Sequence, residues 1–151
     1  MIKNLIVKEC IEILSNNYIG RLAYIAQGQP FVVPITYYYD RHNNSIISYS
    51  AGGFKIESMR KNSLISLEVD EIRSVNRWRS VLAHGLFEEL SSIDAKHQLH
   101  QFAQGVKNII ATKEKENPQF IGEFSSKLEA EGIPIVYRLN IDKITGKQRN
   151  W

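Results

Sequence analysis

The sequence predicts a mainly β fold with peripheral helices, in which six antiparallel strands form a closed or nearly closed barrel. Two observations lead to this prediction. Segments rich in β-branched and aromatic residues follow one another with links of hairpin length. The helical segments are few and do not alternate with the strands, which argues against a parallel α/β sheet. Closure of the barrel would also remove the exposed strand edges of an open sheet.

The first half of the chain begins with a helical pattern and continues as strands. The expected elements are a helix over residues 4–16, strands over 18–26, 31–39 and 45–50, and a short helix over 53–61. Cys10 lies in the first helix, where a small buried hydrophobe is its expected role. Pro34 cannot donate a ladder hydrogen bond, so the second strand is expected to be bulged or edge-like near its middle. The run Tyr37–Tyr39 is expected to fill alternate faces of that strand.

The second half adds three strands and a helical insertion. The expected elements are strands over residues 64–72 and 79–90, helices over 92–107 and 118–130, a last strand over 133–144 and a polar tail over 145–151. Gly85 is expected to mark a bulge or a close backbone approach within its strand. The two helices form an insertion at about 92–131 in a single domain that spans residues 1–151.

The composition limits the partners that the chain is expected to have. The 19 Lys and Arg residues against 16 Asp and Glu residues give a formal charge of +3, and the basic residues are scattered along the sequence with acidic neighbours. Nucleic-acid binding needs Lys and Arg on one face, so no nucleic-acid partner is expected. A single cysteine excludes an internal disulfide, and no apolar run reaches the roughly 20 residues of a membrane span. We expect a soluble cytoplasmic protein without a membrane partner.

The loop Ser50–Lys55 carries the clearest binding pattern, Ser-x-Gly-Gly-x-Lys, between a strand and a helix. Backbone N–H groups and the positive end of a helix favour a bound phosphate, and the lysine adds a full charge. A bare cation at a helix start opposes the helix dipole, so Lys55 is better explained if an anion lies there. The alternative is an ordinary solvated lysine.

Side chains that could carry catalysis or bind a metal form no clear constellation. His97 and His100 lie at i, i+3 on a polar helix without a third ligand, so a solvated helix face is expected. His84 lies within a strand, where it either points into a cofactor cavity or is a satisfied wall residue, and the second role is favoured. No Ser-His-Asp or Cys-His arrangement stands out. No metal site is predicted, and the catalytic residues stay unidentified.

Five segments follow one another in an order typical of a known family: GRLAYI, PFVVPITYYY, SIISYSAGGFKIESMRKN, LISLEVDE and WRSVLAHGLFEEL. The match covers about residues 9–90, and the last strand, ending in DKITGK, extends it. At these spacings the chain resembles the pyridoxamine 5′-phosphate oxidase-like FMN-binding split barrels, and within them the nitroimidazole-resistance-type flavoproteins. The resemblance implies a six-stranded antiparallel FMN-binding split β-barrel. It also implies a homodimer with two FMN sites at the subunit interface, each lined by both subunits.

The resemblance further implies which residues contact the flavin. Matched position by position, they are Val33, Pro34, Ile35 and Thr36 along the isoalloxazine, Ser48, Tyr49, Ser50 and Lys55 at the ribityl chain and phosphate, and Trp78, Arg79, Ser80 and Val81, often at the partner's cofactor. Alternatives stay open for the last group. Arg79 could instead form an ion pair with an acidic neighbour such as Glu88 or Glu89, and Trp78 could seal the dimer interface.

The activity that the resemblance implies is an FMN-dependent oxidoreductase. It would take electrons from NAD(P)H and pass them to a small oxidised acceptor of the nitroaromatic or quinone type. The C-terminal segment KITGKQRNW lacks the paired arginines and the histidine that true pyridoxamine phosphate oxidases use on their substrate, so that activity is not expected. A non-catalytic flavin-binding or haem-handling protein on the same barrel is the alternative.

Overall fold

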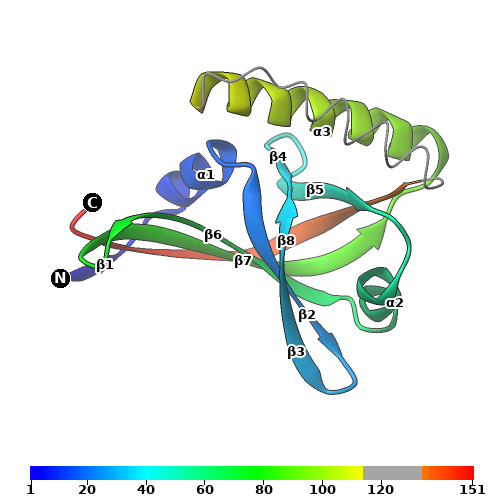
Figure 1. The fold of residues 1–151 in the computed structure, drawn as a ribbon, viewed down its shortest axis with the longest axis horizontal. Helices are drawn as coiled ribbons and strands as arrows, with labels where there is room; N and C mark the ends of the chain where they lie inside the picture. Colours follow the sequence, from blue (N-terminus) through cyan, green and yellow to red (C-terminus); the bar gives the residue numbers. More distant parts are fainter. Residues whose placement is uncertain (114–133) are drawn as a thin grey trace.

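The chain folds around one eight-stranded antiparallel sheet with three helices at its periphery (Figure 1), as seen in a computed structural model that describes residues 1–113 and 134–151. The helices are α1 (Val7–Ser15), α2 (Phe54–Lys61) and α3 (Ser92–Lys113). The strands are β1 (Ile2–Asn4), β2 (Ile19–Ala26), β3 (Gln29–Thr36), β4 (Tyr38–Asp40), β5 (Ser45–Ser50), β6 (Leu64–Ser74), β7 (Arg77–Glu89) and β8 (Ile135–Arg149). The mainly β fold with peripheral helices is therefore confirmed, with two more strands than the six predicted.

The sheet curls back on itself as a split barrel. Its strand order is β3-β2-β6-β7-β8-β5-β4, with β1 added outside this path on β8. The two ends of the path, β3 and β4, are consecutive in the chain and are separated only by Tyr37. The backbone N–H of Tyr37 donates to the carbonyl of Tyr18 at 2.8 Å, and its hydroxyl group donates to the Leu14 carbonyl at 2.8 Å. This buried tyrosine thus joins the two edges of the sheet to the turn after α1.

The segment predicted as one strand over residues 31–39 is two strands, because the chain turns from one edge of the barrel to the other at Tyr37. The prediction for Pro34 is confirmed. It lies in β3, the terminal strand of the sheet path, opposite Arg21 of β2. Tyr37 and Tyr39 are buried and Tyr38 is half-buried, as expected for a run on alternate faces.

The polar tail predicted over residues 145–151 is wrong, because β8 continues to Arg149. Its end is polar, yet it pairs with β7 on one side and with β1 on the other, so backbone hydrogen bonds hold it extended. The same pairing explains why the first helix begins at Val7 and not at residue 4: Ile2–Asn4 form a strand against β8. Gly146 is packed under α1, where an added Cβ would lie 2.6 Å from the Cys10 Sγ.

Each helix covers one part of the barrel through its apolar residues. α1 buries Cys10, Ile13 and Leu14, and α2 buries Ile56 and Met59. The predicted role of Cys10 as a small buried hydrophobe is confirmed, since it is 1% exposed and free. Burial of an apolar side chain stabilises the fold by about 1.5–3 kcal/mol, so these contacts attach both helices to the sheet.

α3 forms the described part of the predicted insertion and is longer than expected, since it reaches Lys113. It lies across β4 and β5 (Figure 1) and buries Phe102, Val106 and Ile110 against Ile47 and Val136. The second helix, predicted over residues 118–130, lies outside the described residues.

Gly85 confirms the prediction of a bulge and of a close backbone approach. The β7–β8 register shifts between His84 and Gly85, so that Gly85 pairs with Ile141 and His84 with Lys143. An added Cβ at Gly85 would lie 1.9 Å from the carbonyl oxygen of Asn140, which is backbone and cannot move aside. Only glycine fits this crossing without a shift of β8.

Candidate functional site: a cavity at the start of helix α2

A cavity of about 390 Å³ lies where the ends of β3 and β5 meet the start of α2. Its lining residues are Ile19, Pro34, Ile35, Thr36, Tyr49, Ser50, Ala51 and Lys55. Small-molecule sites in proteins have volumes of roughly 300–1,000 Å³ and apolar walls with a few placed polar groups. The volume and the mixed lining of this cavity are of that kind.

The curl of the sheet brings these residues together. β3 and β5 are not neighbours in the strand order, but the buried hydroxyl group of Ser48 donates to the Thr36 carbonyl at 2.7 Å. On the other side of β3, Thr36 pairs with Ile19 of β2. The cavity wall is therefore held by contacts from both edges of the barrel.

Lys55 is the charged residue of the cavity lining. It lies in the first turn of α2, whose first intrahelical hydrogen bond runs from the Glu57 N–H to the Gly53 carbonyl at 3.0 Å. The N–H groups of residues 54–56 consequently have no partner within the helix. Lys55 is half-buried and makes no ion pair with any residue of the described ranges, and its burial lowers the pKa of the ammonium group. A cation and free N–H groups at one point suit an anion.

Six of the predicted flavin-binding residues line this cavity: Pro34, Ile35, Thr36, Tyr49, Ser50 and Lys55. Two other residues of the same predicted segments, Val33 and Ser48, lie behind the cavity wall. Val33 is partly buried and packs against the core, and Ser48 is 2% exposed and holds Thr36 in place. The sequence therefore predicted most of this wall from two short segments of the chain.

The remaining four predicted residues lie elsewhere in this chain, at the start of β7. Trp78 and Ser80 are half-exposed, and Val81 is 1% exposed in the core. Arg79 lies on the same side of β7 as Val81 and belongs to the polar network described next. None of the four lines the cavity at α2, so their contact with a partner's cofactor stays a prediction.

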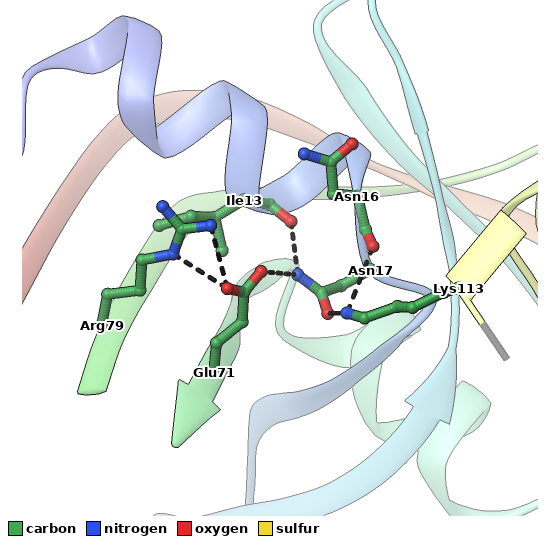
Figure 2. A network of polar contacts seen from close by, with 6 residues as sticks. All are labelled: Ile13, Asn16, Asn17, Glu71, Arg79 and Lys113. Carbon is green, nitrogen blue, oxygen red and sulfur yellow. Dashed lines mark hydrogen bonds and ion pairs between the residues drawn. The ribbon is translucent and has the colours of Figure 1, made fainter. Parts of the chain in front are cut away.

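Figure 2 shows a polar network that joins β6, β7, the end of α1 and the end of α3 around Glu71. Arg79 donates to Glu71 Oε2 from Nε at 2.9 Å, and its Nη2 lies 2.9 Å from the same oxygen. Asn17 Nδ2 donates to Glu71 Oε1 at 2.9 Å and to the Ile13 carbonyl at 2.8 Å. Lys113 donates to Asn17 Oδ1. Partial burial acts to raise the pKa of Glu71, but the hydrogen bonds from Arg79 and Asn17 outweigh it and the net pKa is lowered.

The ion pair considered for Arg79 exists, but its predicted partners are wrong. Arg79 pairs with Glu71, whereas Glu88 pairs with Arg138 at 3.1 Å and Glu89 pairs with Arg60 at 2.6 Å. β6 and β7 form a hairpin in which Glu71 lies directly opposite Arg79. Glu88 and Glu89 lie at the far end of Arg79's own strand, about 30 Å away at 3.3 Å per residue.

The histidines do not contribute to the cavity. His84 Nδ1 lies 2.5 Å from Ser66 Oγ and lines a separate hollow with Ser66 and Asp142, as the favoured wall role implies. His97 and His100 are exposed on α3, as expected. Residues 1–113 and 134–151 contain no group of three or more His, Cys, Asp or Glu side chains that could hold a metal. Within the same ranges, no helix is long and apolar enough to cross a membrane.

Sequence reasoning missed two residues of the cavity lining, Ile19 and Ala51. Ala51 follows the predicted Ser50 and lies within the Gly-rich loop, so its position in the sequence could have predicted it. Ile19 follows from strand pairing, since the β2–β3 hairpin places it opposite Thr36. Counting outward from the turn at Gly28 would have found it.

A family comparison identifies the class of protein that this fold and cavity define. The family model described as "Pyridoxamine 5'-phosphate oxidase" matches residues 7–148, and the chain belongs to this family. Among individual proteins, it is 34% identical over 90 residues to an uncharacterized protein of Rhizobium meliloti (strain 1021). That match covers 60% of this chain and spans only 58% of the relative's length.

Solved structures agree with the split-barrel fold. A FAD-binding protein of Mesorhizobium loti has a TM-score of 0.75 and 28% identity, with 99% of each chain covered. A putative 5-nitroimidazole antibiotic resistance protein of Bacteroides thetaiotaomicron has a TM-score of 0.70 and 17% identity, with 98% of this chain and 89% of that chain covered. At 17% identity, the similarity to the Bacteroides thetaiotaomicron protein concerns the fold alone. The predicted kind of barrel is confirmed by both.

Proposed function

We propose that this protein binds a flavin in the cavity at the start of α2 and uses it as an NAD(P)H-dependent oxidoreductase. The single observation that carries this proposal is Lys55, a half-buried cation in the cavity wall without a counterion among the described residues. Burying a charge is unfavourable unless it is paired, so the site is better explained with an anion bound. The phosphate of a flavin supplies that anion.

The chain's own groups fit the other parts of a flavin as well. The phosphate would be held by Lys55 and by the free N–H groups of residues 54–56. The polar edge of the isoalloxazine would lie along Pro34–Thr36, because β3 ends the sheet path and its outer backbone groups have no ladder partner there. Pro34 lacks an N–H and therefore loses nothing by facing the ligand.

The proposed cofactor is FMN, whose terminal phosphate is a single dianionic group that one lysine and a helix start can hold. The relative from Mesorhizobium loti is named as FAD-binding. FAD shares the isoalloxazine and ribityl parts, so the same wall would accept it if the rest of the cofactor left the cavity. Chromatography of the cofactor released by heat distinguishes the two.

The proposed reaction needs few acid or base residues from the protein. When bound, the flavin supplies the redox chemistry, taking electrons from a nicotinamide donor and passing them to a small acceptor of the nitroaromatic or quinone type. The chain's part is to hold the ring against the β3 backbone and to bind the phosphate. This division of work fits a cavity whose lining contains neither a carboxylate nor a histidine.

The proposed assembly is a homodimer with the two flavin sites at the interface. The cavity is partly open to solvent in a single chain, so a second subunit would complete it. The outward face of the sheet also carries exposed apolar residues, among them Ile72, Leu64 and Val32, at 60–67% exposure. Contact with a second subunit there would remove this apolar surface from water.

The test is the visible spectrum of the purified protein, followed by NAD(P)H oxidation with a nitroaromatic or quinone acceptor. We expect flavin absorbance and turnover above that of free FMN. A yellow protein without turnover would support flavin binding and reject the oxidoreductase. A colourless protein that takes up neither FMN nor FAD would reject the whole proposal.

A further inference from the structure

Three arginines gather around one tryptophan at the far end of the sheet from α2. The Cζ atoms of Arg73, Arg79 and Arg77 lie 4.1, 4.5 and 5.9 Å from the ring centroid of Trp151. Arg73 is near the end of β6, and the other two are in β7, so the tip of the β6–β7 hairpin presents all three. Trp151 follows the end of β8, which pairs with β7 at Trp78.

The positive charge of this arginine cluster is only partly neutralised. Glu71 pairs with Arg79, whereas Arg73 and Arg77 are exposed and have no carboxylate within ion-pair distance among residues 1–113 and 134–151. Asp70, the next acidic residue on β6, is already 2.9 Å from Arg21. Counted over side chains, the cluster therefore carries two arginines in excess over its one carboxylate.

Further basic residues reach the same end of the sheet through strand pairing. Arg149 of β8 pairs with both Trp78 and Ile2, and Lys147 pairs with Ser80 and Asn4. These residues are scattered along the sequence, which suggested a solvated surface, yet the fold collects them at one end of the sheet. Arg149 and Lys147 lie there on the face of Trp78 and Ser80, opposite to that of Arg79. The charge distribution thus differs from the one that the sequence indicated.

Like charges gathered within about 6 Å of one ring centre repel one another. The indole ring offsets part of this cost through cation–π contacts. A guanidinium that stacks on a ring keeps its in-plane N–H groups free, and Arg73 and Arg77 have no hydrogen bond to the described residues. The unsatisfied donors and the excess charge both favour a bound anion.

We propose that Arg73, Arg77 and Arg79, held around Trp151, form a binding site for a phosphate monoester of a small molecule. Arginines pair with phosphate in a bidentate, charge-assisted way. All three guanidinium groups lie within about 6 Å of the same ring centre, so their positive charge is confined to one small region, as binding of a single small anion requires. A nucleic-acid backbone instead needs a track of cations along its length.

Two phosphate monoesters follow from the proposed function: the 2′-phosphate of a nicotinamide dinucleotide donor, and the flavin phosphate held by a second subunit. The assignment to either source rests on that proposed function, whereas the phosphate site itself stands on the cluster alone. Binding measurements with small phosphates therefore test the site whether or not the protein carries flavin.

The test is titration calorimetry of the purified full chain with 2′-AMP, inorganic phosphate and adenosine. We expect binding of the two phosphates and none of adenosine. The double variant Arg73→Gln, Arg77→Gln should weaken 2′-AMP binding at least about tenfold, because charge-assisted hydrogen bonds are lost. Arg73→Lys, Arg77→Lys keeps the charge and should lose less. Arg41→Gln, in the exposed β4–β5 turn, is the matched control and should change nothing.

Two further arms identify the source of the phosphate. Tighter binding of NADP⁺ than of NAD⁺, lost in the double glutamine variant, assigns the site to the donor. Loss of flavin from the same variant, with NADP⁺ and NAD⁺ bound equally, assigns it to the flavin. A colourless protein that still binds 2′-AMP through Arg73 and Arg77 would reject the proposed function and keep this site.

Three outcomes would overturn the site. The first is a wild-type chain that binds no phosphate. The second is unchanged 2′-AMP affinity in a folded double glutamine variant, with folding checked by circular dichroism. The third is salt-dependent retention of double-stranded DNA that 2′-AMP does not reverse, which would mark the basic end as a polyanion surface.

Discussion

Two polar regions at the edges of this barrel differ in how their charges are satisfied. At Glu71 the carboxylate receives hydrogen bonds from Arg79 and Asn17, and Lys113 reaches the same asparagine (Figure 2). At the start of α2, Lys55 is half-buried in a cavity wall with no carboxylate partner within the described ranges. Both regions lie at points where the sheet meets a helix, so position does not explain the difference.

Under the proposed function, this difference separates a structural region from a ligand site. A polar network whose members satisfy one another ties helices and strands together, and here the Glu71 carboxylate and the Asn17 amide are already engaged by groups of the chain itself. An unpaired, partly desolvated cation costs free energy in the chain alone and recovers it when an anion binds. Substitutions should therefore act on stability at Glu71 and on ligand affinity at Lys55, and each prediction below tests that contrast.

The largest expected effect is that of Lys55→Glu on flavin affinity. The substitution removes a charge-assisted hydrogen bond to the phosphate and adds a repelling carboxylate, so we expect affinity to fall about a hundredfold or more. Flavin fluorescence titration measures the change. Lys55→Met should also weaken binding, yet leave the flavin-free protein as stable or slightly more stable, because an unpaired buried charge is gone.

Lys61→Glu, in the last turn of the same helix and outside this cavity, is the matched control for Lys55. It should leave flavin affinity within about twofold, because screening weakens interactions between exposed charges. Equal losses at both positions would mean that general charge, and not the cavity, governs binding. Full affinity in Lys55→Glu would remove this lysine from the site.

The next largest effect is expected on stability, from Glu71→Gln. Arg79 would lose its charged partner in a setting where both side chains are about one-fifth exposed or less, so we expect a loss of about 2 kcal/mol. The Tm should fall by roughly 4–8 °C for a chain of this size. Glu88→Gln, which breaks a more exposed pair with Arg138, should cost less than about 1 kcal/mol. Similar losses in both variants would contradict the structural role of the network.

The pH dependence of this effect has a definite sign. The folded-state pKa of Glu71 is below its ordinary value of 4.5, so the carboxylate's contribution is fully present above pH 4.5 and is lost as the pH falls through the folded pKa. Wild type and Glu71→Gln should therefore converge in Tm at strongly acidic pH. A difference that stays constant down to that pH would show that the charge of Glu71 is not what stabilises the network.

The two regions were not equally predictable from the sequence. The wall around Lys55 comes from segments that are local in the chain. Local patterns indicated the anion-binding Gly-Gly loop and the edge-like strand at Pro34, and the family resemblance assigned the flavin contacts of Pro34–Thr36, Tyr49 and Ser50. Gly85 was predictable for the same reason, since a lone glycine in a strand has few explanations. Such features depend on a few consecutive residues, and a pattern is enough to find them.

The Glu71 network depends on pairings between distant segments, and these were missed. Asn17 and Lys113 are separated by 96 positions in the chain, and no local pattern links them. The β6–β7 register would have placed Glu71 opposite Arg79 had the turn near Asn76 been located first. The extension of β8 was missed because a polar segment paired on both sides carries no apolar alternation. The residues that a second subunit would contribute to the site likewise cannot be predicted from a single sequence.

A smaller effect is expected from Glu68→Gln on the outer face of the sheet. Desolvation, with further contributions from the neighbouring Asp70, raises the pKa of Glu68 to about 7, although Arg21 acts in the opposite direction. Because this pKa is above its ordinary value of 4.5, the folded state is favoured below pH 4.5 and loses stability as the pH rises to about 7.

Urea unfolding at pH 5 and pH 8 measures this dependence on pH. We expect Glu68→Gln to be more stable than wild type at pH 8 and closer to it at pH 5, by less than about 1 kcal/mol because the group is partly solvated. Glu12→Gln, on the exposed side of α1, should show no such difference. A variant less stable than wild type at pH 8 would mean that the pair with Arg21 outweighs the repulsion from Asp70.

The smallest effect is expected from Lys113→Met at the end of the described part of α3. Lys113 is exposed, and its ammonium group donates to Asn17 Oδ1 and, at 3.4 Å, to the Asn16 carbonyl. Removing it leaves Asn17 bound to Ile13 and Glu71, so we expect a loss of about 0.5 kcal/mol, measured by urea unfolding against Lys107→Met on the same helix. A loss above about 2 kcal/mol would show that α3, and not the Arg79 pair, holds this network together. An unchanged stability, together with a large loss in Glu71→Gln, would place the whole contribution in the strands.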